Sequence, residues 1–152
     1  MPLTKPFKTS PSNPAVSEIQ TRPERIADMP YAPAIRVMAG TNMLWISGAT
    51  ASDLYHKHPH DFSEHDHSAR IEDQVHNAMA NIKEILDQEG LTWTDIVFSR
   101  KYMTDMRDFE TIMMTLKEYF GDWTPASTAI CVNALSTPGA RIELEMVAAY
   151  PE

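Results

Sequence analysis

A long apolar stripe at helical spacing near the centre of the chain places the strongest constraint on how it can fold. Apolar residues recur there every three or four positions, namely Ile71, Val75, Ala78, Met79, Ile82, Ile85 and Leu86. That spacing puts them on one face of an α-helix, and this face has to be buried against another element. Ser68 suits the N-cap and Gly90 suits the position after the C-terminus, so we predict a helix between them.

Shorter segments with other periodicities surround this helix. A second helix is predicted from Asp108 to Phe120, with Gly121 closing it. Strands are predicted over residues 35–38, 43–47, 96–103, 129–133 and 141–149. The last of these strands alternates apolar and acidic residues with a period of two. Residues 40–42 (Gly-Thr-Asn) separate the first two strands and predict a β-hairpin. The order of elements predicts an α+β fold with both helices on one face of a sheet.

The chain divides into a proline-rich N-terminal extension over residues 1–29 and a domain over residues 30–152. Most of the prolines lie near the N-terminus, as Pro2, Pro6, Pro11, Pro14, Pro23, Pro30 and Pro33. Proline lacks a backbone N–H and restricts the residue before it, so this stretch is not expected to form a central strand or a long helix. We predict an extended arm.

Composition narrows the classes of partner. The formal net charge is −8 with only 13 Lys and Arg residues, which argues against binding to a nucleic-acid backbone. No apolar run approaches the ~18 residues of a membrane helix, and no secretory leader is visible. Cys131 is the single cysteine, so the fold does not depend on an internal disulfide. We expect a cytoplasmic protein with a small-molecule substrate and no nucleic-acid or membrane partner.

Several segments, taken in order, carry a family resemblance. They are Pro30-Tyr31-Ala32-Pro33-Ala34, Trp45-Ile46-Ser47-Gly48, residues 74–82, residues 104–109, Pro125-Ala126 and residues 141–145. Over about residues 30–150 the chain resembles the Rid (reactive intermediate deaminase, YjgF-like, endoribonuclease L-PSP) family. The resemblance implies a chorismate-mutase-like α+β fold with a six-stranded mixed sheet. It also implies a homotrimer with pockets between subunits. We expect no cofactor.

The resemblance further implies a site. In deaminating members a water hydrolyses an enamine or imine to a keto acid and ammonia, a glutamate of the last strand handles the water, and an arginine after Pro-Ala grips the substrate carboxylate. Glu143 matches the glutamate, and we expect it to be catalytic. Tyr31, Ser47 and Gly48 match substrate-binding positions. A carboxyl group that exchanges protons with water near neutral pH suits this role.

The match departs from the family at two further substrate-binding positions. Ser127 stands where the arginine is expected, and Met113 stands where many deaminating members carry asparagine. Serine cannot neutralise a carboxylate, whereas arginine binds one with two parallel donors. If the substrate is anionic, another cation has to hold it. The candidates Arg36, Arg100 and Arg141 are not distinguished by the sequence.

Five histidines are concentrated in one polar segment without periodicity, as His56, His58, His60, His65 and His67. We interpret the segment as a loop, and we assign no metal to it. A solvated loop is the simplest reading. Two alternatives stay open: weak capture of a metal ion, and a lid over the pocket in which one histidine acts on the substrate.

Three functions follow from these features. The first is a Rid-type hydrolase or deaminase acting on a small enamine or imine, including the aminomuconate type. The second is a homologue that binds a small metabolite without turning it over, as loss of the arginine would permit. The third is an endoribonuclease, against which the acidic charge counts.

Overall fold

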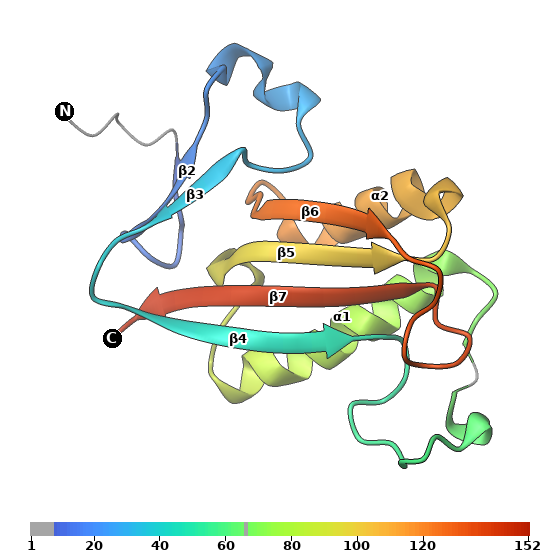
Figure 1. The fold of residues 1–152 in the computed structure, drawn as a ribbon. Coiled ribbons are helices and arrows are strands. Elements are labelled where there is room, and N and C mark those ends of the chain that lie inside the picture. The colour runs from blue at the N-terminus through green and yellow to red at the C-terminus, as the bar shows by residue number, and fades with distance from the viewer. Residues whose placement is uncertain (1–7, 66) are drawn as a thin grey trace.

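A computed structural model describes residues 8–65 and 67–152 of the protein (Figure 1). The strands within this part of the chain are β1 (Lys8–Thr9), β2 (Val16–Ile19), β3 (Ala34–Val37), β4 (Thr41–Ala49), β5 (Ile96–Met103), β6 (Ala126–Cys131) and β7 (Ile142–Pro151). The two α-helices are α1 (Ile71–Gln88) and α2 (Phe109–Phe120). Neither helix is long and apolar enough to cross a membrane, and no other helix among the described residues is.

The main sheet has the strand order β4-β7-β5-β6. Strand β7 pairs antiparallel with both β4 and β5, while β5 and β6 run parallel. Both α-helices lie on one face of this sheet (Figure 1). The α+β class and the mixed sheet are therefore confirmed. The six-stranded single sheet is wrong, because the described residues form a four-stranded sheet and a separate three-stranded sheet of order β1-β2-β3.

The predicted hairpin between the first two strands of the domain is also wrong. Both strands form, but β3 pairs with β2 and β4 pairs with β7. Residues 38–41 make the turn, where the Thr41 hydroxyl donates to the Met38 carbonyl at 2.9 Å and Gly40 takes a positive φ of 80°. The turn predicted at residues 40–42 is therefore present. It leads the chain from the small sheet into the main sheet, so β4 does not pair with β3.

The N-terminal stretch is not an extended arm where the structure describes it. Strand β2 is the central strand of the small sheet, and it contains no proline, so all four of its N–H groups are available to the ladder. Val16 packs with Trp123 and Val147 against the face of the main sheet that lies opposite the helices. Glu18 accepts hydrogen bonds from the amide and hydroxyl of Thr124, which ties the small sheet to the segment before β6. Residues 1–7 lie outside the described part of the chain.

The apolar stripe forms the centre of the core as predicted. Val75, Ala78, Met79 and Ile82 of α1 are fully buried against the main sheet. The helix begins at Ile71 rather than after Ser68, which hydrogen-bonds to Asp73 instead of capping the helix. At the other end Gly90 has a φ of 68°, a conformation that favours glycine.

The second half of the chain follows its predicted pattern closely. Helix α2 ends at Phe120 and is followed by Gly121, whose φ is 57°. Strand β6 begins at Ala126, three residues before the predicted strand at 129–133. Strand β7 alternates along its first half: Ile142, Leu144 and Met146 enter the helix-side core, so the two glutamates between them face the other side. This alternation places both glutamates of β7 on the face of the main sheet opposite the helices.

Candidate functional site

An irregularity at the end of β4 brings two predicted site positions together. The register between β4 and β7 shifts between Ile46 and Ala49, so Ser47 and Gly48 leave the regular ladder. The carboxyl of Glu143 lies so close to Gly48 that a Cβ on this glycine would stand 2.0 Å from its Oε1. Only glycine allows this approach without displacing the carboxyl group. Ser47 is exposed beside it.

The environment of Glu143 stabilises the protonated form of its carboxyl group. Burial raises the pKa of Glu143, and the negative charge of Glu145 raises it further. Glu145 is itself paired with Arg100, whose Nη1 lies 3.1 Å from its Oε2, and it accepts a hydrogen bond from Tyr102. A carboxyl with a raised pKa exchanges protons closer to neutral pH than an ordinary glutamate does, which suits general acid–base chemistry.

Glu143 lies at the wall of a cavity of about 250 Å³. We call it the Glu143 cavity. Its other walls come from the residues after β4, from α1 through Asn81, and from Ser136 and Thr137 in the loop before β7. These loops lie at the same end of the main sheet in Figure 1. The Asn81 amide donates to the carbonyls of Thr50 and of Ser52, at 3.0 and 2.6 Å, and so holds the chain after β4 against α1.

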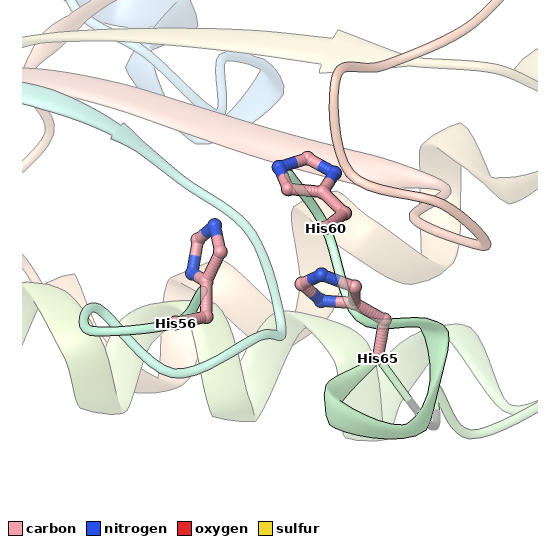
Figure 2. Close-up of side chains that lie close together, drawn as sticks. All are labelled: His56, His60 and His65. Atoms are coloured by element: carbon pink, nitrogen blue, oxygen red, sulfur yellow. The ribbon is translucent and has the colours of Figure 1, made fainter. Parts of the chain in front are cut away.

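The histidine segment folds over the same cavity. His56, His58 and His60 line it together with Glu143. His65 is only 8% exposed, which does not fit a fully solvated loop. Its ring lies within 5.0 Å of the ring of His56 and 4.8 Å of that of His60, measured between centroids (Figure 2). The segment therefore lies over the cavity, as a lid would, and it also brings its imidazole rings close together.

The two positions that depart from the family lie in a different cavity. Met113 of α2 and Ser127 of β6 line a cavity of about 340 Å³, between α2, the sheet and the segment before β3. We call it the Lys101 cavity, because the buried Lys101 also lines it. Lys101 is 2% exposed, and its Nζ donates to the Ser99 hydroxyl at 3.1 Å. Burial lowers the pKa of Lys101 to about 8.

Sequence reasoning missed Lys101, although a signal for it exists. Strand β5 alternates between its two faces, and Ser99, Lys101 and Met103 share the face that the helices cover. Ser127 is the register partner of Ser99 on β6. A lysine at a buried position of a period-two strand is uncommon enough to mark a functional candidate.

The three arginines proposed as replacements do not line either cavity. Arg100 pairs with Glu145, and Arg141 pairs with Asp108, with 3.0 Å between Nε and Oδ2. Arg36 lies on β3 in the small sheet. Among the described residues, Lys101 is thus the buried cation that shares a cavity with the serine at the family's arginine position.

Tyr31 lies outside the linings of both cavities. Its side chain is 38% exposed, and the next residue, Ala32, bridges to Ala126 at the start of β6. The structure therefore gathers Gly48 and Glu143 at one cavity, with Ser47 adjoining, and Met113 and Ser127 at another. Tyr31 stands near the second group, because Pro30 lines the Lys101 cavity.

Comparison with known proteins gives a consistent picture. Residues 21–150 match the family model described as Endoribonuclease L-PSP. A RutC family protein of Pyrococcus horikoshii is 36% identical over 78 residues, which cover 51% of this chain and 61% of that protein. The human 2-iminobutanoate/2-iminopropanoate deaminase is 36% identical over 81 residues, 53% of this chain and 58% of that protein. These matches therefore span less than two thirds of either relative.

Solved structures share the fold over more of the chain. YyfA of Yersinia pestis, a protein of the conserved Rid family, superposes with a TM-score of 0.60. The two chains are 26% identical, and the superposition covers 88% of this chain and 98% of the other.

We predict a pH-dependent stability difference for Glu143→Gln. Because the pKa of Glu143 is higher in the folded than in the unfolded chain, its contribution favours folding below about pH 4.5, the ordinary value, and is lost as the pH rises through the raised pKa. Glutamine does not ionise, so the variant does not lose stability in this way as the pH rises. Urea denaturation at several pH values should show the free energy of unfolding of Glu143→Gln rising relative to the parent as the pH increases. A difference that is constant or falls would contradict the raised pKa.

Proposed function

We propose that this chain, which belongs to the endoribonuclease L-PSP family, also called Rid or YjgF, hydrolyses a small enamine or imine in the Glu143 cavity. One observation carries the proposal: a carboxyl group with a raised pKa is held against Gly48 at the wall of a cavity. The deaminase names of relatives such as the human protein support the reaction class. The aminomuconate type belongs to that class and enters as a test compound.

The proposed reaction needs one group that moves protons in both directions. Water adds to the carbon of a protonated C=N bond while Glu143 accepts a proton from that water, which gives a neutral carbinolamine; an enamine reaches the protonated C=N form by gaining a proton at carbon. Glu143 then returns its proton to the nitrogen, the C–N bond breaks as the hydroxyl becomes a carbonyl, and the departing ammonia takes the hydroxyl proton and leaves as ammonium. A carboxyl group whose pKa lies above its usual range serves as base in the first half and as acid in the second. The hydroxyls of Ser136 and Thr137 offer further hydrogen bonds to a bound substrate.

The shape and charge of the chain favour a small molecule over RNA. A cavity of about 250 Å³ lies just below the ~300–1,000 Å³ typical of ligand pockets, so it suits only a small molecule. The net charge of −8 disfavours the many phosphate contacts on which RNA binding depends. We therefore place hydrolysis of a small C=N compound ahead of endoribonuclease activity.

The activity is tested with freshly generated 2-aminoacrylate and 2-aminomuconate, by following ammonia release. We expect Glu143→Gln to lower the rate with the active compound by about 10²–10⁴-fold, the usual contribution of general acid–base catalysis. Glu110→Gln, at an exposed position of α2, serves as the matched control and should leave the rate unchanged. Ammonia release by Glu143→Gln at the parent rate would refute the role of this carboxyl group.

A second candidate function is binding of a small carboxylate without turnover, in the Lys101 cavity. The observation that favours it is a buried ammonium group whose hydrogen bond, among the described residues, goes to the neutral Ser99 hydroxyl. A buried charge is costly unless an opposite charge or several hydrogen bonds compensate it. A bound carboxylate would supply that compensation, with the Ser127 hydroxyl as a neighbouring donor.

Binding in this cavity should depend on pH and on Lys101. The pKa of about 8 means that Lys101 is largely protonated at pH 7 and loses its charge as the pH rises. Isothermal titration with pyruvate should therefore show affinity falling above about pH 8. Lys101→Met, which keeps the length of the side chain without its charge, should abolish the pH dependence and weaken binding by at least tenfold. Lys117→Met, at the exposed rim of the same cavity, is the control. Unchanged pyruvate binding by Lys101→Met would refute the anion site.

We also propose that the protein is a homotrimer. The face of the main sheet opposite the helices presents large apolar side chains beyond the area that the small sheet covers. Trp45 is 75% exposed, and Met43 and Ile130 are 40% and 38% exposed. Large apolar side chains exposed on one face of a sheet are typical of subunit interfaces.

Sedimentation velocity tests the assembly. The parent should sediment as a species of three times the 17.2 kDa chain mass at micromolar concentration. Trp45→Glu should shift the population towards the single chain, because it places a charge in the apolar face. A parent that sediments at the mass of one chain would refute the homotrimer.

A further inference from the structure

We propose that His56, His60 and His65 form a binding site for a zinc-type divalent metal ion at the wall of the Glu143 cavity (Figure 2). We call these residues the three-histidine site. The inference does not rest on the proposed hydrolysis, and it rests on geometry that neither the family resemblance nor the relatives' names describe.

The ligand atoms of the three side chains converge. One nitrogen from each imidazole lies within 4.8 Å of the corresponding nitrogens of the other two. Zinc–nitrogen bonds of ~2.0–2.1 Å place tetrahedral ligand atoms about 3.4 Å apart, so the most distant pair has to close by about 1.4 Å. Rotation of the imidazole rings about their side-chain torsions is the movement required for this. Figure 2 shows the three rings around a common space, with His56 reaching it from one part of the loop and His65 from another.

His65 supplies a second, independent observation. The residue is 8% exposed, and its Nε2 is buried without a hydrogen-bond partner among the described residues. Its other nitrogen, Nδ1, lies 2.8 Å from the hydroxyl of Ser52, which is itself buried. A buried nitrogen with an unused lone pair or proton is unusual and requires an explanation. A metal ion bound at Nε2 would provide one.

His56 shows the same arrangement. Its Nδ1 lies 2.8 Å from the carbonyl oxygen of Asp53. A carbonyl only accepts hydrogen bonds, so Nδ1 carries the proton and Nε2 of the neutral ring carries the lone pair. Metal-binding histidines commonly donate from one ring nitrogen to a carbonyl or another oxygen and bind the metal through the other. Two of the three histidines thus have the outer partner that such a site needs.

The loop that carries these residues is tied down at several points. The carbonyl of Ser52 accepts from Asn81 of α1 at 2.6 Å. Further along, the carboxyl of Glu64 accepts from the Lys57 amide at 2.8 Å and pairs with its Nζ at 3.2 Å. The segment therefore presents its imidazoles from a folded loop, which lowers the entropic cost of gathering three ligands.

The donor set indicates the class of metal. Three imidazole nitrogens suit zinc and related transition ions, whereas calcium and magnesium prefer oxygen ligands. Two carboxylates of the same loop are engaged elsewhere, Asp61 with Ser63 and Glu64 with Lys57. Three protein ligands leave a fourth position of a tetrahedral ion for water or substrate. Because His56 and His60 also line the Glu143 cavity, an ion held by them would lie at its wall.

The test is a titration of the metal-free full chain with Zn²⁺ in competition with a chromophoric chelator. We expect one tight equivalent per chain for the parent. His60→Gln and His65→Gln should each weaken binding by more than the ~10–100-fold that loss of an outer partner costs, and Ser52→Ala should weaken it within that range. His76→Gln, which removes an exposed histidine of α1, should keep the parent affinity.

Two controls keep the result interpretable. Circular dichroism checks folding, and because His60 is partly exposed, His60→Gln decides the outcome if the buried His65→Gln fails to fold. Co²⁺ in place of Zn²⁺ should give the visible absorption of a tetrahedral ion in the parent and lose it in His60→Gln. Absence of a tight equivalent in the parent, or equal loss of affinity in His76→Gln, would overturn the three-histidine site. Neither readout depends on catalysis.

Discussion

The alternation of β7 is the constraint on which the rest of the structure depends. Ile142, Leu144 and Met146 are buried beneath the helices, and they sit in the middle of the main sheet between β4 and β5. A shift of one residue would turn these side chains to the opposite face and would bury the glutamates under α1. Packing of the apolar stripe of α1 therefore sets the register of β7. The same register presents Glu143 to the cavity and Glu145 to Arg100.

The cavity side of this strand depends on a second constraint, the lack of a side chain at Gly48. The bulge at the end of β4 and the approach of the Glu143 carboxyl belong together, because any Cβ at Gly48 would occupy the place of that carboxyl. The chain then leaves β4 and passes along α1, where Asn81 binds two of its carbonyls. The histidines follow within this restrained loop. The proposed proton-transfer group and the proposed metal site thus share a wall because one strand end positions both.

Local patterns predicted the elements much better than their pairing. Both helices, the strand at residues 96–103 and the alternating last strand lie where the periodicity placed them. The hairpin failed because a Gly-Thr-Asn turn is compatible with two destinations for the chain. The prediction of an extended N-terminal arm failed because prolines on either side of Val16–Ile19 do not remove backbone N–H donors from the four residues between them. Lys101 was missed because its position on the covered face of β5 becomes significant only once the helices are placed.

The sequence by itself determined the family, the α+β class and the candidate residues Gly48, Glu143 and Ser127, because these follow from local periodicity and from ordered motifs. Only the tertiary structure decided which residues meet. It placed Ser127 and Met113 beside Lys101 rather than beside Glu143, and it gathered three histidines of a segment without periodicity around one point. The physical reason is that cavities and ligand clusters form between elements distant in the chain, through packing and strand order that no local pattern encodes.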